Sequence, residues 1–166
     1  MSERGVGNVD FNETYIILRS YSLRLLKSFD VYYFNGTRVR SISNPEGILC
    51  LALLDAGHVI TGGCDRILRI WDIATGICLR ELDGHGGTIC SVDTHDDGVI
   101  VSGDRIGAVI IWSKKDALEG REVRLASFTD PNGFSVVQMR LKVGKTFLVR
   151  CYPALQKSIT VTKFLA

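Results

Sequence analysis

The sequence predicts an all-β protein assembled from repeated units of about four strands. Two segments, 61–71 and 102–112, share one order: a hydroxyl residue, a glycine, a short polar turn and an apolar strand that ends in tryptophan. Short runs in which apolar and polar residues alternate continue through the rest of the chain, separated by turn-forming residues. Each of the two segments therefore predicts a β-hairpin, and we expect no helix.

The two clearest units occupy approximately residues 44–83 and 84–129. In the first we expect strands at 48–53, 59–61, 67–71 and 78–82, joined by turns at 55–58, 62–66 and 74–76. In the second we expect strands at 88–92, 99–102, 109–112 and 123–128, joined by turns at 95–98 and 103–107 and by a longer, charged turn at 113–121. The two units thus repeat the same order of strands and turns.

Two less regular units flank this pair, at approximately 5–43 and 130–166. The earlier unit has expected strands at 9–11, 15–19 and 31–34, and the later one at 135–141, 146–151 and 158–165. We expect about four units and fifteen strands in a single repeat region, 1–166, with the last unit one strand short. An open arrangement of this kind leaves unpaired strand edges, which favours self-association through them.

The dipeptide Gly84-His85 lies between the two repeated segments, whose tryptophans, Trp71 and Trp112, are forty-one residues apart. In this order and spacing the chain resembles the WD40-repeat family, in which a unit of about 40 to 45 residues forms one four-stranded blade of a β-propeller. Since propellers have about 4 to 8 blades, we interpret the chain as a partial propeller, a fragment or variant covering the C-terminal part of a larger one. Two alternatives remain open: an arc that closes against another chain, and a four-bladed ring completed by the N-terminal segment.

The resemblance also implies a polar network inside each blade, which links a tryptophan indole, a hydroxyl, a histidine and an aspartate in series. In unit 44–83 the matching residues are Thr61, Asp65 and Trp71, and the histidine position falls near Asn44-Pro45. In unit 84–129 they are His85, Ser102 and Trp112, with Ile106 at the aspartate position and Asp104 two residues too early. We therefore expect two incomplete networks, with stability carried mainly by apolar packing.

Composition narrows the class of protein. A hydrophobic content of 46% and a charged content of 23% are typical of a globular protein, and a net charge of +2 does not predict a nucleic-acid partner. Five cysteines without a CxxC pair indicate buried thiols in a reducing compartment. Neither a signal core nor a membrane-spanning run is present, so we expect no membrane association and a cytoplasmic or nuclear location.

Three patterns imitate chemical sites, and each has a simpler interpretation. The acidic run 93–104 approaches a calcium loop but contains an apolar strand, and Gly144-Lys145-Thr146 lacks the glycine and helix of a phosphate loop. Ser102, His85 and Asp65 could form a hydrolase triad, but the repeat explains them as structural partners. We expect no metal, no cofactor and no catalysis.

The resemblance places partner binding on the turns 63–66 and 103–106 and on the segments 44–46 and 84–87, which share one rim in WD40 propellers. The candidate residues are Arg66, Arg105, Asp104 and Cys64, because arginine binds carboxylate or phosphate through paired hydrogen bonds and Cys64 is a thiol in an expected exposed turn. Other proteins or peptides are the expected partners.

A narrower resemblance concerns one segment. The sequence Trp71-Asp72-Ile73-Ala74-Thr75-Gly76-Ile77-Cys78-Leu79 is similar to blades of F-box/WD substrate receptors. The last unit, from Gly133-Phe134 to Lys163-Phe164, also looks like the final blade of such receptors. Three functions therefore stay open: a non-catalytic interaction scaffold, the substrate-recognition part of a ubiquitin ligase, and a hydrolase.

Overall fold

The computed structural model describes residues 5–21, 27–95, 98–121, 124–129, 135–142, 146–152 and 155–160. These residues form four antiparallel sheets, each from one continuous stretch of chain. The first sheet contains β1 (Gly5–Phe11), β2 (Tyr15–Tyr21), β3 (Ser28–Tyr33) and β4 (Arg38–Ser43), and the second contains β5 (Ile48–Leu53), β6 (His58–Gly63), β7 (Leu68–Asp72) and β8 (Cys78–Leu82). The third contains β9 (Ile89–His95), β10 (Val99–Asp104), β11 (Ala108–Ser113) and β12 (Arg124–Thr129), and the fourth contains β13 (Ser135–Lys142), β14 (Thr146–Tyr152) and β15 (Leu155–Thr160).

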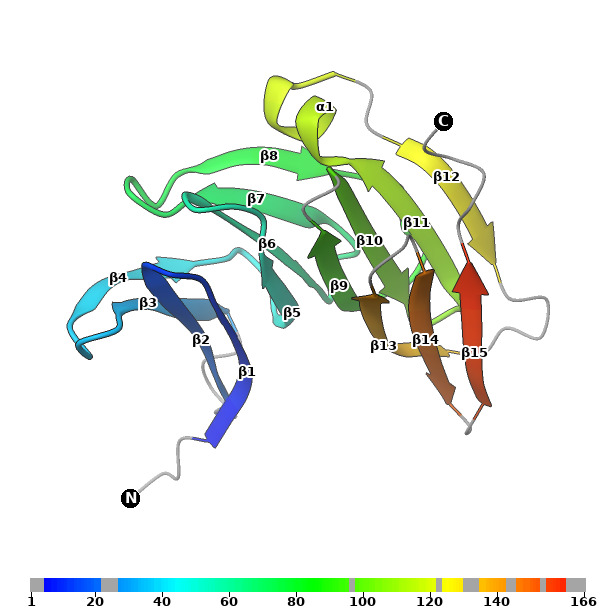
Figure 1. Ribbon diagram of the computed structural model, residues 1–166, viewed down its shortest axis with the longest axis horizontal. Helices are drawn as coiled ribbons and strands as arrows, with labels where there is room; N and C mark the ends of the chain where they lie inside the picture. The colour runs from blue at the N-terminus through cyan, green and yellow to red at the C-terminus, as the bar shows by residue number, and fades with distance from the viewer. Residues whose placement is uncertain are drawn as a thin grey trace.

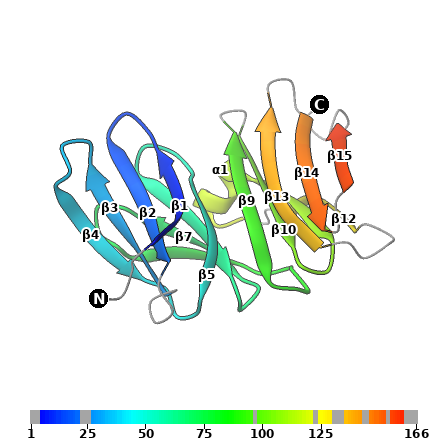
Figure 2. The same cartoon turned by 90° about the horizontal axis from the view of Figure 1, so that it is seen from below.

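The sheets are arranged like consecutive blades of a propeller. Within each sheet the strands pair in sequence order, and the first strands β1, β5, β9 and β13 lie next to one another along the chain of sheets. Figures 1 and 2 show the four sheets fanned into an arc, with the first and last sheets at its two ends. The predicted all-β fold of partial-propeller blades is confirmed.

Buried side chains fill the spaces between neighbouring sheets. Ile17, Phe29 and Val31 of the first sheet pack against Val59 and Trp71 of the second. The second and third sheets are joined in the same way, by a group that includes Ile60, Ile70, Ile89, Ile100 and Trp112. Each tryptophan therefore occupies the layer between its own sheet and the preceding one, so the sheets are stabilised by packing face to face.

Polar side chains tie the first strands of the sheets together. The Asp10 carboxylate accepts a hydrogen bond from the Leu53 backbone N–H at 2.7 Å. From the other side, the Thr94 hydroxyl donates to the Leu53 carbonyl at 2.6 Å. Strand β5 is thereby held between β1 and β9, which fixes the position of each sheet relative to the next.

One expected turn contains a helix. The segment 113–121, expected to be a turn, contains α1 (Lys114–Glu119). This helix contacts β8 of the second sheet, and its Ala117 is buried. Ser113 caps its first turn by accepting the Asp116 backbone N–H, and Gly120 ends it with a φ of 76°. The expectation of no helix was wrong because this short segment has its own cap residues, which outweigh its lack of a long amphipathic period.

Two strand expectations also differ from the structure. The third strand of the last sheet runs from Leu155 to Thr160 rather than over 158–165, and residues 161–165 of that expectation lie outside the described part of the chain. In the first sheet, β4 forms from Arg38–Ser43, for which no strand was specified. Its Ile42 is buried and Val39 packs against the same core, but these two apolar residues are three positions apart and give no alternation that would identify the strand.

The first sheet leaves one face uncovered. Along β1, Asn8 and Asp10 hydrogen-bond to β5, whereas Val9 and Phe11 point away and are 49% and 66% exposed. The Phe11 ring packs edge-on against Phe34, which is also exposed. Because the sheets stack face to face, this end of the arc presents an apolar sheet face in addition to strand edges.

We expect Trp71→Ala and Trp112→Ala each to lower the free energy of unfolding by about 3 to 5 kcal/mol, because each removes a buried indole from between two sheets. Chemical denaturation followed by circular dichroism measures the change. Ile77→Ala is the control, since Ile77 is 60% exposed and its loss should change stability by less than about 0.5 kcal/mol. Unfolding curves for both tryptophan variants that match the parent would contradict the assigned packing.

Candidate functional site

A buried chain of hydrogen bonds crosses the third sheet. The Trp112 indole donates to Ser102 Oγ at 2.7 Å, and Ser102 Oγ lies 2.6 Å from His85 Nε2. Since an indole N–H only donates, the Ser102 hydroxyl accepts from Trp112 and donates to Nε2. His85 therefore carries its proton on Nδ1 and donates it to Asp104 Oδ2 at 3.0 Å.

Asp104 completes this network, which corrects the expectation that its acidic member was missing. Its Oδ1 accepts the backbone N–H groups of Ile106 and Ala108, and its Oδ2 accepts that of Gly87 as well as the histidine. Ile106, at the position expected to hold the acid, is 53% exposed. An aspartate at the end of β10 reaches both the following turn and the segment before β9, so it replaces one placed two residues later.

Asp104 is also 0% exposed, so a partner has no access to it. Its assignment as a partner-binding candidate was therefore wrong. A polar residue in a turn is expected to point into solvent. The Asp104 carboxylate points inward instead, because it accepts hydrogen bonds from His85 and from the Ala108 backbone N–H.

The protonation of His85 follows from its surroundings. Burial lowers the pKa of His85 below its ordinary value, and the adjacent Asp104 carboxylate opposes this effect without reversing it. The folded protein therefore keeps this imidazole neutral at neutral pH, in the tautomer that the hydrogen bonds require.

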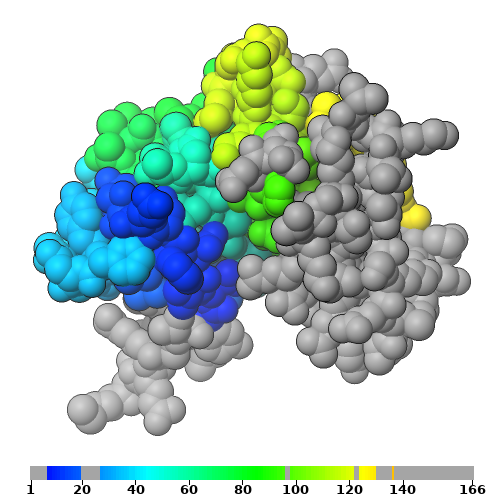
Figure 3. Space-filling view, viewed as in Figure 1, coloured from blue at the N-terminus to red at the C-terminus, as the bar shows by residue number. Residues whose placement is uncertain are grey.

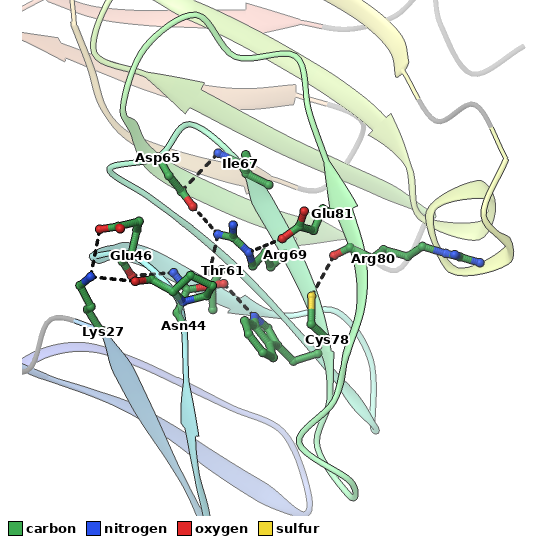
Figure 4. Close-up of polar contacts among 12 residues, drawn as sticks. Lys27, Asn44, Glu46, Thr61, Asp65, Ile67, Arg69, Cys78, Arg80 and Glu81 are labelled. Atoms are coloured by element: carbon green, nitrogen blue, oxygen red, sulfur yellow. Dashed lines mark hydrogen bonds and ion pairs between the residues drawn. The ribbon is translucent and has the colours of Figure 1, made fainter.

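The second sheet solves the same problem with different residues. The Trp71 indole donates to Thr61 Oγ1 at 2.9 Å, but Asn44 stands where the third sheet has its histidine. Arg69 donates to Asp65 Oδ2 at 2.5 Å, to Glu81 Oε1 at 2.8 Å and to Asn44 Oδ1 at 3.5 Å. Figure 4 shows Asp65, Glu81 and Asn44 gathered around this guanidinium.

Sequence reasoning placed Asn44 at the histidine position but missed Arg69 and Glu81. Arg69 is only 5% exposed, and although burial opposes its charge, the hydrogen bonds to Asp65 and Glu81 raise the pKa of Arg69. A signal was present, because an arginine inside the apolar strand 68–71 must find acceptors when it is buried. Glu81 lies directly opposite Arg69 in the β7–β8 pairing and supplies one of them.

The turns after β6 and β10 meet the segments that lead into β5 and β9. The Cys64 backbone N–H donates to the Gly47 carbonyl and that of Arg105 donates to the Thr88 carbonyl, both at 2.9 Å. We call turns 63–66 and 103–106, with segments 44–46 and 84–87, the rim. Cys64, Arg66 and Arg105 are exposed on it.

The rim also carries a backbone in an unusual conformation. Arg66 has a φ of 70°, and the equivalent position in the third sheet is Gly107, with a φ of 89°. Arg66 alone among the described non-glycine residues has a positive φ. Glycine adopts this region at little cost, whereas a side chain there is strained, so the second sheet presents an arginine where the third has none.

The buried Ser102, His85 and Asp104 have the order of a hydrolase triad, but their environment differs from that of an active site. Ser102 is 0% exposed, and its oxygen already accepts the Trp112 indole. Asp65, the acid considered from the sequence, instead binds Arg69 in the neighbouring sheet. The geometry ties the third sheet to the segment before β9 and leaves the hydroxyl of Ser102 buried.

Among the described residues, no group of three or more histidine, cysteine, aspartate and glutamate side chains is placed to hold a metal ion. The helix in this part of the chain is too short to cross a membrane. The four cysteines whose side chains are described are free thiols, of which Cys64 is the exposed one.

Comparison with known proteins agrees with this architecture. The sequence matches the WD40 family, described as "WD domain, G-beta repeat", over residues 36–72 and 76–113. These stretches contain Trp71 and Trp112 with the turns that precede them. Residues 36–113 therefore carry WD40 repeats. Proteins of this family generally serve as non-catalytic interaction scaffolds.

Individual relatives of this WD40 chain carry diverse names. It is 32% identical over 91 residues to "Protein ROOT INITIATION DEFECTIVE 3" of Arabidopsis thaliana, covering 52% of this chain and 21% of that protein. It is 36% identical over 59 residues to "Probable coatomer subunit beta'" of Schizosaccharomyces pombe, covering 35% of this chain and 7% of that protein. The WD40 chain thus spans only a small part of the length of these relatives.

Among solved structures, the WD40 β-propeller domain of Doa1 superimposes with a TM-score of 0.79 at 22% identity. The match covers 96% of this chain and 52% of that one. At this identity the similarity concerns the fold alone, and it indicates that the four sheets correspond to about half of a propeller domain.

We expect Ser102→Ala to destabilise the protein by about 1 to 3 kcal/mol, because the Trp112 indole and His85 Nε2 would each lose a buried partner. Thermal and chemical unfolding measure the loss. Ser43→Ala on exposed Ser43 is the matched control, and an equal effect of both changes would contradict the role of Ser102.

We also expect stability to fall as the pH drops below about 6.5, the ordinary histidine pKa. The pKa of His85 is lower in the folded than in the unfolded protein, so the unfolded protein binds the proton first and is favoured by acid. Unfolding free energies measured from pH 8 to pH 5 test this. His85→Gln removes the titrating group, and its curve should lose part of the acid-dependent decline. Identical pH dependence of variant and parent would refute this assignment.

Proposed function

We propose that this WD40 chain is a non-catalytic protein–protein interaction scaffold whose partners dock on the rim. The observation that carries the proposal is the pair of exposed arginines, Arg66 and Arg105, on equivalent turns of adjacent sheets. Within the described part of the chain, neither guanidinium forms an ion pair. Two unpaired arginines held on neighbouring turns suit a partner that presents carboxylate or phosphate groups.

The conformation of Arg66 supports this proposal. A glycine would occupy its left-handed backbone conformation without strain, as Gly107 does in the third sheet. A strained arginine that makes no ion pair within the described structure adds nothing evident to folding. Retention of the side chain is explained if it binds a partner.

The surroundings of Arg105 add an apolar component to the rim. Ile106 beside it is 53% exposed and lies over Gly86 and Gly87, where a Cβ would approach its side chain to 3.0 and 3.1 Å. Burial raises the pKa of the nearby Cys90 thiol, although the charge of Arg105 and its hydrogen bond to this thiol act to lower it. A partner would therefore meet charge and apolar surface together, as at protein interfaces in general.

We expect the double change Arg66→Glu and Arg105→Glu to abolish binding of rim partners while the fold is retained. Affinity capture with parent and variant, followed by identification of the bound proteins, measures the loss. Arg38→Glu is the control, because Arg38 is exposed on β4 away from the rim. Partners that bind the double variant and the parent equally would contradict docking on the rim.

The same capture distinguishes a narrower function, the substrate-recognition part of an F-box/WD-type ubiquitin ligase. The support for it is the similarity of segment 71–79 to blades of those receptors. Recovery of a cullin adaptor with the protein would favour this function. Partners unrelated to ubiquitin ligation would favour the general scaffold. A cytoplasmic or nuclear location is part of the proposal in either case.

Self-association also remains a proposal, and the apolar face of the first sheet is its best support. Val9 and Phe11 are exposed on that face, where a further blade would cover them. We expect the purified chain to sediment as a dimer or larger species. Phe11→Lys should shift it toward monomer in analytical ultracentrifugation, and a monomeric parent chain at high concentration would refute the proposal.

A further inference from the structure

A basic cavity lies where the second and third sheets meet, next to Gly84 of the rim. It has a volume of about 520 Å³ and is bounded by the end of β8 on one side and by α1 and the start of β12 on the other. Figure 3 shows α1 projecting from the edge of the molecule next to the second sheet. The volume is within the range of sites that bind small molecules or side chains, about 300 to 1,000 Å³.

Two arginines cross this cavity in opposite directions. Arg80 extends from β8 toward α1, as Figure 4 shows, and a Cβ on Gly120 would lie 2.2 Å from its Nη2. Arg124 extends back from β12, and a Cβ on Gly84 would lie 2.1 Å from its Nη2. Each guanidinium thus rests on a glycine of the opposite wall, which leaves room for both inside the cavity.

Trp112 gives the cavity an aromatic wall. The Arg124 guanidinium lies 5.9 Å from the centre of its ring, an arrangement that orients the arginine by cation–π attraction. Trp112, Leu82 and Ala117 of the lining are only 1%, 6% and 0% exposed, so they form a buried floor that positions Arg124. What the cavity offers a ligand is chiefly positive charge.

The charges around the cavity do not cancel. Arg121 is paired with Asp116 and Glu119, and Glu81 is paired with Arg69. Asp83 is the remaining acid of the lining, and its Oδ1 accepts the Gly84 backbone N–H at 2.7 Å. Within the described structure Arg80 and Arg124 form no ion pair. The lining itself, with Arg80, Arg121 and Arg124 against Glu81 and Asp83, therefore carries an excess of one positive charge.

We propose that this cavity binds an acidic side chain of a peptide, its carboxylate or phosphate group held between Arg80 and Arg124. Arginines from opposite walls suit an anion placed between them, because each presents paired N–H donors to oxygen. The volume exceeds that of a free phosphate ion, so it has room for a side chain together with its carboxylate or phosphate group. The site uses neither Arg66 nor Arg105 and adjoins the rim at Gly84, so one partner can contact both.

Calorimetry with a capped peptide of six glutamates tests the proposal, with the glutamine peptide as the uncharged control. We expect the glutamate peptide to bind at low ionic strength and to weaken as salt is added. Arg80→Gln with Arg124→Gln should weaken it at least about tenfold, equivalent to about 1.4 kcal/mol. Arg66→Gln with Arg105→Gln removes the same charge from the rim and should leave the affinity within about twofold of the parent.

Arg80→Gln alone keeps the test valid if loss of Arg124 disturbs the fold, since Arg80 is exposed and its own change should weaken binding measurably. A peptide with a central phosphoserine, compared with the glutamate peptide, shows whether phosphate or carboxylate is preferred. Binding of either peptide that depends on Arg80 and Arg124 supports the site. Inorganic phosphate binding as tightly as the peptides would overturn the peptide assignment. No binding to the parent, or equal loss in cavity and rim variants, would overturn the proposal, whereas loss only in the rim variants would support the rim alone.

Discussion

The structure depends on burying an indole between two sheets without leaving its N–H unpaired. Trp71 and Trp112 fill the layers that join the first to the second sheet and the second to the third. An indole N–H in such a layer needs an acceptor, since an unpaired buried donor costs about 1 to 3 kcal/mol. Thr61 and Ser102, ten residues before each tryptophan and across the hairpin, supply that acceptor.

The two sheets satisfy the rest of the requirement differently. In the third sheet the hydroxyl is followed by neutral His85 and by Asp104, whose four N–H partners connect the turn to the segment before β9. In the second sheet, charged Arg69 occupies the corresponding region with Asp65 and Glu81. Burial lowers the pKa of His85 in the folded protein, so acid favours the unfolded state through this residue of the third sheet.

Much of the fold could be predicted because it is local. The hairpin that ends in Trp71 and the one that ends in Trp112 are short, and alternation with turn residues determines them. α1 could not be predicted by alternation, because it is six residues long and is set by its caps Ser113 and Gly120. The place of Asp104 in the network could not be predicted from spacing either, since a carboxylate reaches across the turn from more than one position.

The candidate sites were less predictable than the fold. The exposure of Arg66 and Arg105 followed from their turns, but the unusual backbone of Arg66 is visible only in three dimensions. The cavity between Arg80 and Arg124 brings together residues from β8, α1 and β12 of two sheets. No sequence period relates these residues, because their proximity results from how one sheet is placed against the next.

The close approach at Gly63 restricts how the two repeats can diverge. Gly63 holds the place in the second sheet that Asp104 holds in the third, and a Cβ there would lie 1.8 Å from the Gly47 carbonyl oxygen. Exchanging Gly63 for aspartate would therefore collide with the main chain before the carboxylate could reach any donor. A single replacement at Gly63 therefore cannot give the second repeat the histidine network of the third. That network would also require the backbone before β5 to move.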